Sequence, residues 1–174
     1  MRNLLLILTL TYFSYADSGN ILGKTTQDVK PVDNQLYIQE CASCHFGYQP
    51  GLLPQKSWKA LMANLENHFG TDASLNQKDF DAINSYLMEN SADKAKEYKR
   101  SNKIAKSTEN ITTPIISILE IPYIKKEHQG IPKKLIIQED VKSLSNCISC
   151  HKTADKGYYG ERHIIIPNFG KWED

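Results

Sequence analysis

The chain has 174 residues, 40% of them hydrophobic, and 21 basic side chains stand against 20 acidic ones. A formal net charge of +1 excludes a nucleic-acid-binding protein on charge, because such proteins carry a strongly basic surface. The length suits one domain or two small ones.

The first 16 residues have the three parts of a secretory signal peptide. Met1 and Arg2 make a short positive start, Leu4 to Phe13 is apolar, and Ser14-Tyr15-Ala16 is a small-x-small cleavage site. An uncleaved anchor helix is the alternative, but the apolar run is short for a membrane span. We therefore expect a periplasmic protein with no integral membrane span after cleavage. The mature chain would begin with a flexible N-terminal tail over residues 17–30.

Residues 31–106 form the expected first half of the mature protein. Along Val32 to His45, three side chains share one helical face at i, i+4 and i+7, namely Tyr37, Cys41 and Cys44. A turn-rich loop follows, and then apolar residues recur at helical spacing. The next predicted helix is Trp58–Phe69, with Ser57 as its N-cap and Gly70 as its stop. A second starts with the capping box Ser74–Gln77 and ends near Asn90. A third, charged and solvent-facing, runs from Ala92 to Ala105.

Residues 107–174 form the expected second half. Pro114, Pro122 and Pro132 interrupt short apolar runs, which predicts a winding segment with one short helix ending near His128. The remaining glycines and prolines, after residue 151, predict an irregular tail.

The pattern Cys-x-x-Cys-His occurs twice, as Cys41-Ala42-Ser43-Cys44-His45 and as Cys147-Ile148-Ser149-Cys150-His151, and uses all four cysteines. Two thiols so spaced can form thioethers with the two vinyl groups of a haem, and the adjacent histidine can bind its iron. A structural zinc site or a thioredoxin-like pair would leave the histidines unexplained. The motifs therefore predict two covalently bound haem c groups, with His45 and His151 as proximal iron ligands.

The second axial ligand of each iron decides whether the haem is closed or open to a substrate. His68 follows His45 by 23 positions, and His128 precedes His151 by the same 23. His163 lies near the second motif and is an alternative ligand. Met62 and Met88 could also bind iron, although methionines in apolar helices more often pack in a core.

A run of basic residues lies between positions 94 and 106. It fits a docking patch for an acidic redox partner, or a solvated helix face, and the sequence leaves both interpretations open.

Blocks along the chain resemble the bacterial diheme cytochrome c family. They include Tyr37–His45, Tyr48–Pro54, Ser57-Trp58, His68-Phe69-Gly70, Asp72–Leu75, Ile121–His128 and Asn146–His151. The resemblance implies a periplasmic electron carrier with two bis-His haems, in which His68 and His128 are the distal ligands. It also implies redox partners such as a small high-spin monohaem cytochrome or a membrane-bound cytochrome b.

We expect a mostly α protein, with cytochrome c-like helices around two covalently bound haems and a long irregular segment before the second motif. It would be a monomeric electron-transfer carrier with no catalysis of its own, pairing His45 with His68 and His151 with His128. The alternative is a diheme peroxidase-like enzyme, or a haem-based sensor, with one open iron site.

Overall fold

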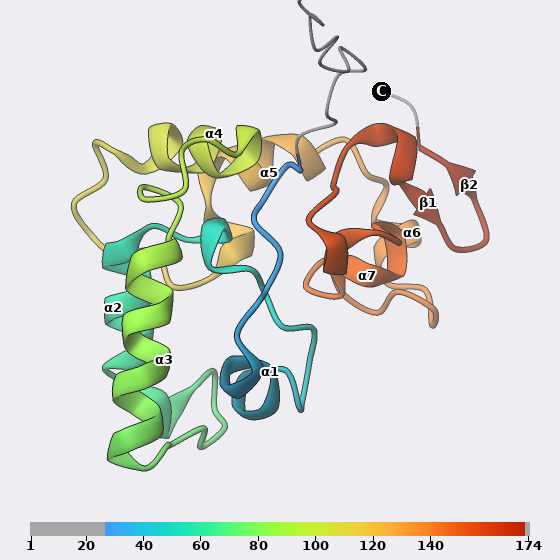
Figure 1. Ribbon diagram of the computed structural model, residues 1–174. Helices are drawn as coiled ribbons and strands as arrows, with labels where there is room; N and C mark the ends of the chain where they lie inside the picture. The colour runs from blue at the N-terminus through green and yellow to red at the C-terminus, as the bar shows by residue number, and fades with distance from the viewer. Residues whose placement is uncertain (1–26, 173–174) are drawn as a thin grey trace, which may run out of the picture.

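The computed structural model describes residues 27–172, and over that range the chain is mostly helical (Figure 1). Its α-helices are α1 (Gln35–Cys41), α2 (Gln55–Met62), α3 (Gln77–Asn90), α4 (Lys99–Thr108), α5 (Pro122–His128), α6 (Lys133–Ile136) and α7 (Cys147–Cys150). Short 3-10 turns cover Pro50–Leu52, Leu65–Asn67, Ile118–Glu120, Ala154–Lys156 and Glu161–His163. A small antiparallel hairpin joins β1 (Ile165–Ile166) to β2 (Gly170–Lys171).

The helices gather in three groups (Figure 1). Helices α2 and α3 pack side by side, and α1 contacts α3 at one end. Helix α4 lies against α5, and α7 packs against β1. The second motif therefore sits in a region of short elements, away from the longer helices of the first half.

A single hydrophobic core connects these groups. The cluster includes Tyr37 and Trp58 from the first half and Ile124 and Tyr159 from the second, all nearly fully buried. The indole of Trp58 donates to the carbonyl of Pro50 at 2.7 Å, so its one polar group is satisfied inside the core. The predicted boundary between residues 106 and 107 thus runs through one continuous core.

Two of the predicted helices begin at well-formed caps. The Asn34 side chain accepts from the Tyr37 amide at 2.9 Å, which starts α1 and places Tyr37 in the core. Asn76 accepts from the Asp79 amide at 3.1 Å and starts α3, so the cap is Asn76 and the predicted Ser74 capping box is wrong. Helix α3 ends at Asn90 as predicted and buries Ile83 and Leu87.

The predicted helix Trp58–Phe69 is wrong at both ends. Helix α2 begins at Gln55 and ends at Met62. His68 and Thr71 then exchange backbone hydrogen bonds of 2.8 and 3.1 Å, while the Asn67 side chain accepts from the Gly70 amide at 3.2 Å. These local bonds replace the helical ones, so His68 lies in a tight turn.

The stretch from Ala92 to Ala105 is neither one helix nor fully solvent-facing. The Ala92 amide donates to the Leu53 carbonyl at 2.9 Å, and Ala92 is fully buried, which holds residues 91–98 in turns. Helix α4 starts only at Lys99, and its Ile104 and Thr108 pack inward. Helix α4 is rich in lysine but therefore has one buried face.

The second half agrees with the prediction of a short helix, because α5 ends at His128. The segment also contains α6, and the C-terminal part, predicted as irregular, includes the β1–β2 hairpin.

The expected signal peptide, residues 1–16, and most of the expected tail lie outside the described residues. At the end of that tail, Val29 is fully buried, and the amides of Asp28 and Val29 donate to the Gly157 carbonyl at 2.9 and 3.1 Å. The prediction of a flexible tail is therefore wrong from residue 27 onward. Between residues 27 and 172, no helix is long and apolar enough to cross a membrane.

The contact between residues 28–29 and Gly157 should require glycine at position 157. Its φ is +78°, and an added Cβ would lie 2.1 Å from the Val29 carbonyl oxygen. We expect Gly157→Ala to lower the free energy of unfolding by about 2–4 kcal/mol, measured by urea denaturation. Gly130→Ala is the matched control, since a Cβ added there would meet no atom within 4 Å; an equal loss in both variants would contradict the expectation.

Candidate haem sites

The first motif begins at the end of a buried helix. Tyr37 anchors α1 in the core, and Cys41 follows one turn later at the end of the helix. Cys44 and His45 then lie at the surface. His45 Nδ1 donates to the Phe46 carbonyl at 2.8 Å, which leaves Nε2 as the nitrogen with a free lone pair.

His68 reaches this motif from its tight turn. The ring centroids of His45 and His68 lie 6.1 Å apart, and the ring planes differ by 22°. Partial burial lowers the pKa of His68, and the nearby His45 lowers it further. Both effects favour the neutral form of the ring, which is the form that binds a metal ion.

The second motif is the short helix α7 itself. The Ser149 hydroxyl donates to the Asn146 carbonyl at 2.7 Å and fixes the turn. His151 follows and pairs with Ile164 in an isolated β-bridge. Burial lowers the pKa of His151 to about 4, with a further contribution from His128. Its Nδ1 is buried without a hydrogen-bond partner among the described residues.

His128, the last residue of α5, faces His151. Its Nδ1 donates to the Ile124 carbonyl one turn earlier at 2.8 Å, which again leaves Nε2 with the lone pair. The two ring centroids lie 6.1 Å apart, but here the ring planes differ by 69°. A backbone bond to the second ring nitrogen is the usual way in which proteins orient a metal-binding histidine.

Both histidine pairs have the separation needed to enclose one metal ion. Metal–imidazole bonds of about 2 Å on opposite sides of an ion place the ring centres about 6 Å apart. The sequence-predicted residues Cys41, Cys44, His45 and His68 thus gather at one place, and Cys147, Cys150, His151 and His128 at another. The donor sets fit two haems, each with two axial imidazoles.

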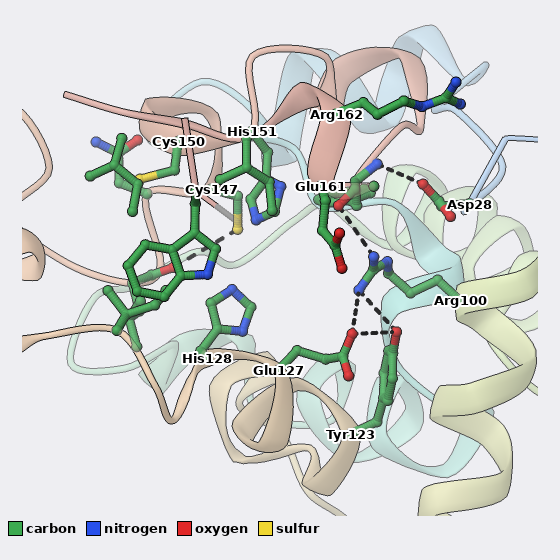
Figure 2. Close-up of a pocket in the computed structure, with 18 of the residues that line it drawn as sticks. Asp28, Arg100, Tyr123, Glu127, His128, Cys147, Cys150, His151, Glu161 and Arg162 are labelled. Carbon is green, nitrogen blue, oxygen red and sulfur yellow. Dashed lines mark hydrogen bonds and ion pairs between the residues drawn. The ribbon is translucent and has the colours of Figure 1, made fainter. Parts of the chain in front are cut away.

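A cavity of about 390 Å³ adjoins the second set. Cys147, Cys150, His128 and His151 line it, and Figure 2 shows the ring of His128 beneath Cys147 and His151. The remaining walls include Tyr159 and several charged side chains. The lining combines apolar residues with charged ones, a mixture that suits a porphyrin ring that carries carboxylates.

The alternative ligands lie elsewhere. His163 does not line the cavity, and its ring contacts Tyr158 at 5.8 Å between centroids. Met62 is buried in the hydrophobic core, and Met88 packs partly buried against it. The geometry therefore favours His68 and His128 over these three.

The thiols are buried to different degrees and form no disulfide. Burial raises the pKa of both Cys41 and Cys147 to about 11, with smaller contributions from neighbouring groups. Within residues 27–172, no three His, Cys, Asp or Glu side chains are arranged to coordinate one metal ion together.

Sequence reasoning missed three residues beside these sites. Tyr159 packs against His151 at 5.2 Å between ring centroids, Tyr48 packs against His45 at 5.3 Å, and Arg100 lines the cavity. The two tyrosines carry no signal of their own. Arg100 could have been found, because it precedes Ile104 and Thr108 on one face of a helix, at i, i+4 and i+8.

Comparison with known proteins gives a consistent result. The sequence profile of the family described as dihaem cytochrome c matches residues 37–159. The solved structure of a diheme cytochrome c from Rhodobacter sphaeroides is 35% identical, with a TM-score of 0.64 over 75% of this chain and all of that one. A diheme cytochrome type c from Shewanella baltica is 34% identical, with a TM-score of 0.64 over 80% of this chain and 98% of that one. A search of curated proteins finds no match.

Tyr159 should stabilise the second site through a buried polar contact. Its hydroxyl donates to Gln49 Oε1 at 2.6 Å. Tyr159→Phe leaves that oxygen buried without a donor, so we expect the free energy of unfolding to fall by about 1–3 kcal/mol in chemical denaturation. Tyr158→Phe removes a hydroxyl that makes no hydrogen bond between residues 27 and 172, and a loss as large there would refute the assignment.

Proposed function

The chain belongs to the dihaem cytochrome c family, whose members carry two c-type haems with iron, and from this we propose that it is a periplasmic electron carrier with two closed, bis-His haems. Each haem, when bound, supplies an iron that exchanges one electron between its ferrous and ferric states. The protein itself would provide attachment, two axial ligands at each iron, and exclusion of other ligands.

The observation that carries the proposal is the pair of facing histidines at each motif. Both pairs have ring centroids 6.1 Å apart, and each pair joins a motif histidine to one from a separate segment. Cys41 and Cys44 would hold the first haem, with His45 and His68 as ligands. Cys147 and Cys150 would hold the second, with His151 and His128 as ligands.

Closed irons favour a carrier over an enzyme. A peroxidase or a gas sensor needs one iron position that opens to an exogenous ligand. Here His128 is fixed by the Ile124 carbonyl, and His68 by the backbone bonds to Thr71. We therefore propose that the protein transfers electrons without catalysing a reaction of its own.

The proposed location and partners follow from the attachment chemistry. Cys-x-x-Cys-His motifs receive haem outside the bacterial cytoplasm, which suits the signal-like residues 1–16. The proposed partners are other redox proteins, with a small monohaem cytochrome or a membrane cytochrome b as the expected types. We propose that the carrier itself is a monomer.

Optical spectra of the purified protein test the closed irons. We expect wholly low-spin spectra in the ferric and ferrous forms, unchanged by carbon monoxide, since two imidazoles occupy each iron. A high-spin fraction that binds carbon monoxide would instead show an open site and favour the peroxidase-like or sensor alternative.

Substitution of the distal histidines tests the ligand assignment. We expect His128→Ala and His68→Ala each to leave both haems attached, because the thioethers are untouched, but to convert one of the two haems to a high-spin form that binds carbon monoxide. His163→Ala is the control and should leave the spectrum unchanged. If His163→Ala opens a haem and His128→Ala does not, His163 is the ligand.

A further inference from the structure

Arg100 extends from α4 into the cavity of the second motif (Figure 2). Its side chain is only 13% exposed. One terminal nitrogen, Nη2, donates to the Tyr159 carbonyl at 3.2 Å, and the other, Nη1, donates to the Tyr123 hydroxyl at 3.1 Å. The guanidinium also lies 5.5 and 5.7 Å from the ring centroids of these two tyrosines, so it is held firmly in place.

The charge of Arg100 is incompletely paired inside the protein. Glu127 is its ion-pair partner, but the Nη1–Oε2 distance is 3.7 Å, which is too long for a hydrogen bond. The same carboxylate oxygen accepts from the Tyr123 hydroxyl at 3.0 Å. Arg100 Nε is buried and has no partner among the described residues. A buried guanidinium donor without an acceptor is costly and points to a ligand that supplies one.

Other cations line the same cavity, but they are placed differently. Lys99, Lys103 and Arg162 are all exposed, and Figure 2 shows the Arg162 guanidinium directed away from Cys147 and His151. Among the described residues that line the cavity, Arg100 is the one cation with a mostly buried side chain. An anion inside the cavity would therefore meet Arg100.

A haem bound in this cavity would supply an anion, the propionate. A haem carries two carboxylates, and the residues proposed to hold the second haem line the same cavity as Arg100. We propose that Arg100 binds a propionate of the second haem by charge-assisted hydrogen bonds and raises the reduction potential of that haem. A guanidinium suits this task because it stays charged and its planar donors match a carboxylate. The inference rests on the proposed attachment of the second haem through Cys147 and Cys150.

The effect on potential follows from charge. A positive group that neutralises a propionate favours the ferrous iron, which carries one charge fewer than the ferric iron. Removal of Arg100 leaves the propionate uncompensated and favours the ferric form. The residues proposed to hold the first haem do not line this cavity, so only one of the two potentials should respond.

Spectroelectrochemical titration of the haem-loaded protein measures this response. We expect Arg100→Gln to lower the reduced-to-oxidised ratio of one haem about tenfold at fixed potential, equivalent to about 59 mV for one electron. Arg162→Gln is the matched control, removing the same charge from the cavity rim, and should change the ratio less than about twofold. Equal shifts in the two variants, or no shift in Arg100→Gln, would overturn the proposal.

A second variant keeps the test decisive if Arg100→Gln does not fold. Glu127→Gln removes the competing carboxylate and should raise the same haem's reduced-to-oxidised ratio, because Arg100 is then left to the propionate. An unchanged or lowered ratio counts against the contact.

A crystal structure of the unsubstituted, haem-loaded protein reads the contact directly. We expect a guanidinium nitrogen of Arg100 about 2.7–3.2 Å from a propionate oxygen. Propionates that both lie out of reach of Arg100 would refute the proposal. The distance is independent of spin state, so a failure of the bis-His assignment, seen in the optical spectra, would be distinguished from a failure of this contact.

Discussion

The buried side-chain amide of Gln49 joins the segments that follow the two haem motifs. Gln49 is fully buried between the first motif and the second half. Its Nε2 donates to the Ala154 carbonyl, just past the second motif, and its Oε1 accepts from the Tyr159 hydroxyl. A buried amide is tolerated only where such partners exist, so this contact specifies how the segments after the two motifs meet.

Tyr48, the residue before Gln49, contacts the segment just before the second motif. The Tyr48 hydroxyl donates to the Ser145 carbonyl at 2.6 Å, two residues before Cys147, and its ring packs against His45. Tyr159 in turn packs against His151. Two consecutive residues therefore reach both candidate haem sites. These contacts tie the two candidate sites to each other, which would keep the two centres of the proposed carrier at a set separation.

The sequence predicts the haem motifs and several helices well, but it predicts local backbone conformation and long-range burial poorly. The two motifs, α3 and the end of α5 at His128 follow from local patterns that tertiary contacts reinforce. The apolar spacing predicts a helix at His68, but the Asn67 side chain and the bonds between His68 and Thr71 compete with the helical ladder there. The spacing of Arg100, Ile104 and Thr108 marks one face of α4, but the burial of that face depends on α5, which lies far along the chain. Such long-range packing has no signature in a local window.

The two histidine pairs differ in one respect, the angle between their rings. On the proposed pairing, the rings at the first iron are nearly parallel, at 22°, and those at the second are closer to perpendicular, at 69°. Parallel imidazoles direct their π orbitals at the same iron d orbital, whereas crossed imidazoles divide them between two. The magnetic anisotropy of the two ferric irons would then differ, and electron paramagnetic resonance could follow each centre separately within one molecule, even though both irons would have the same type of ligands.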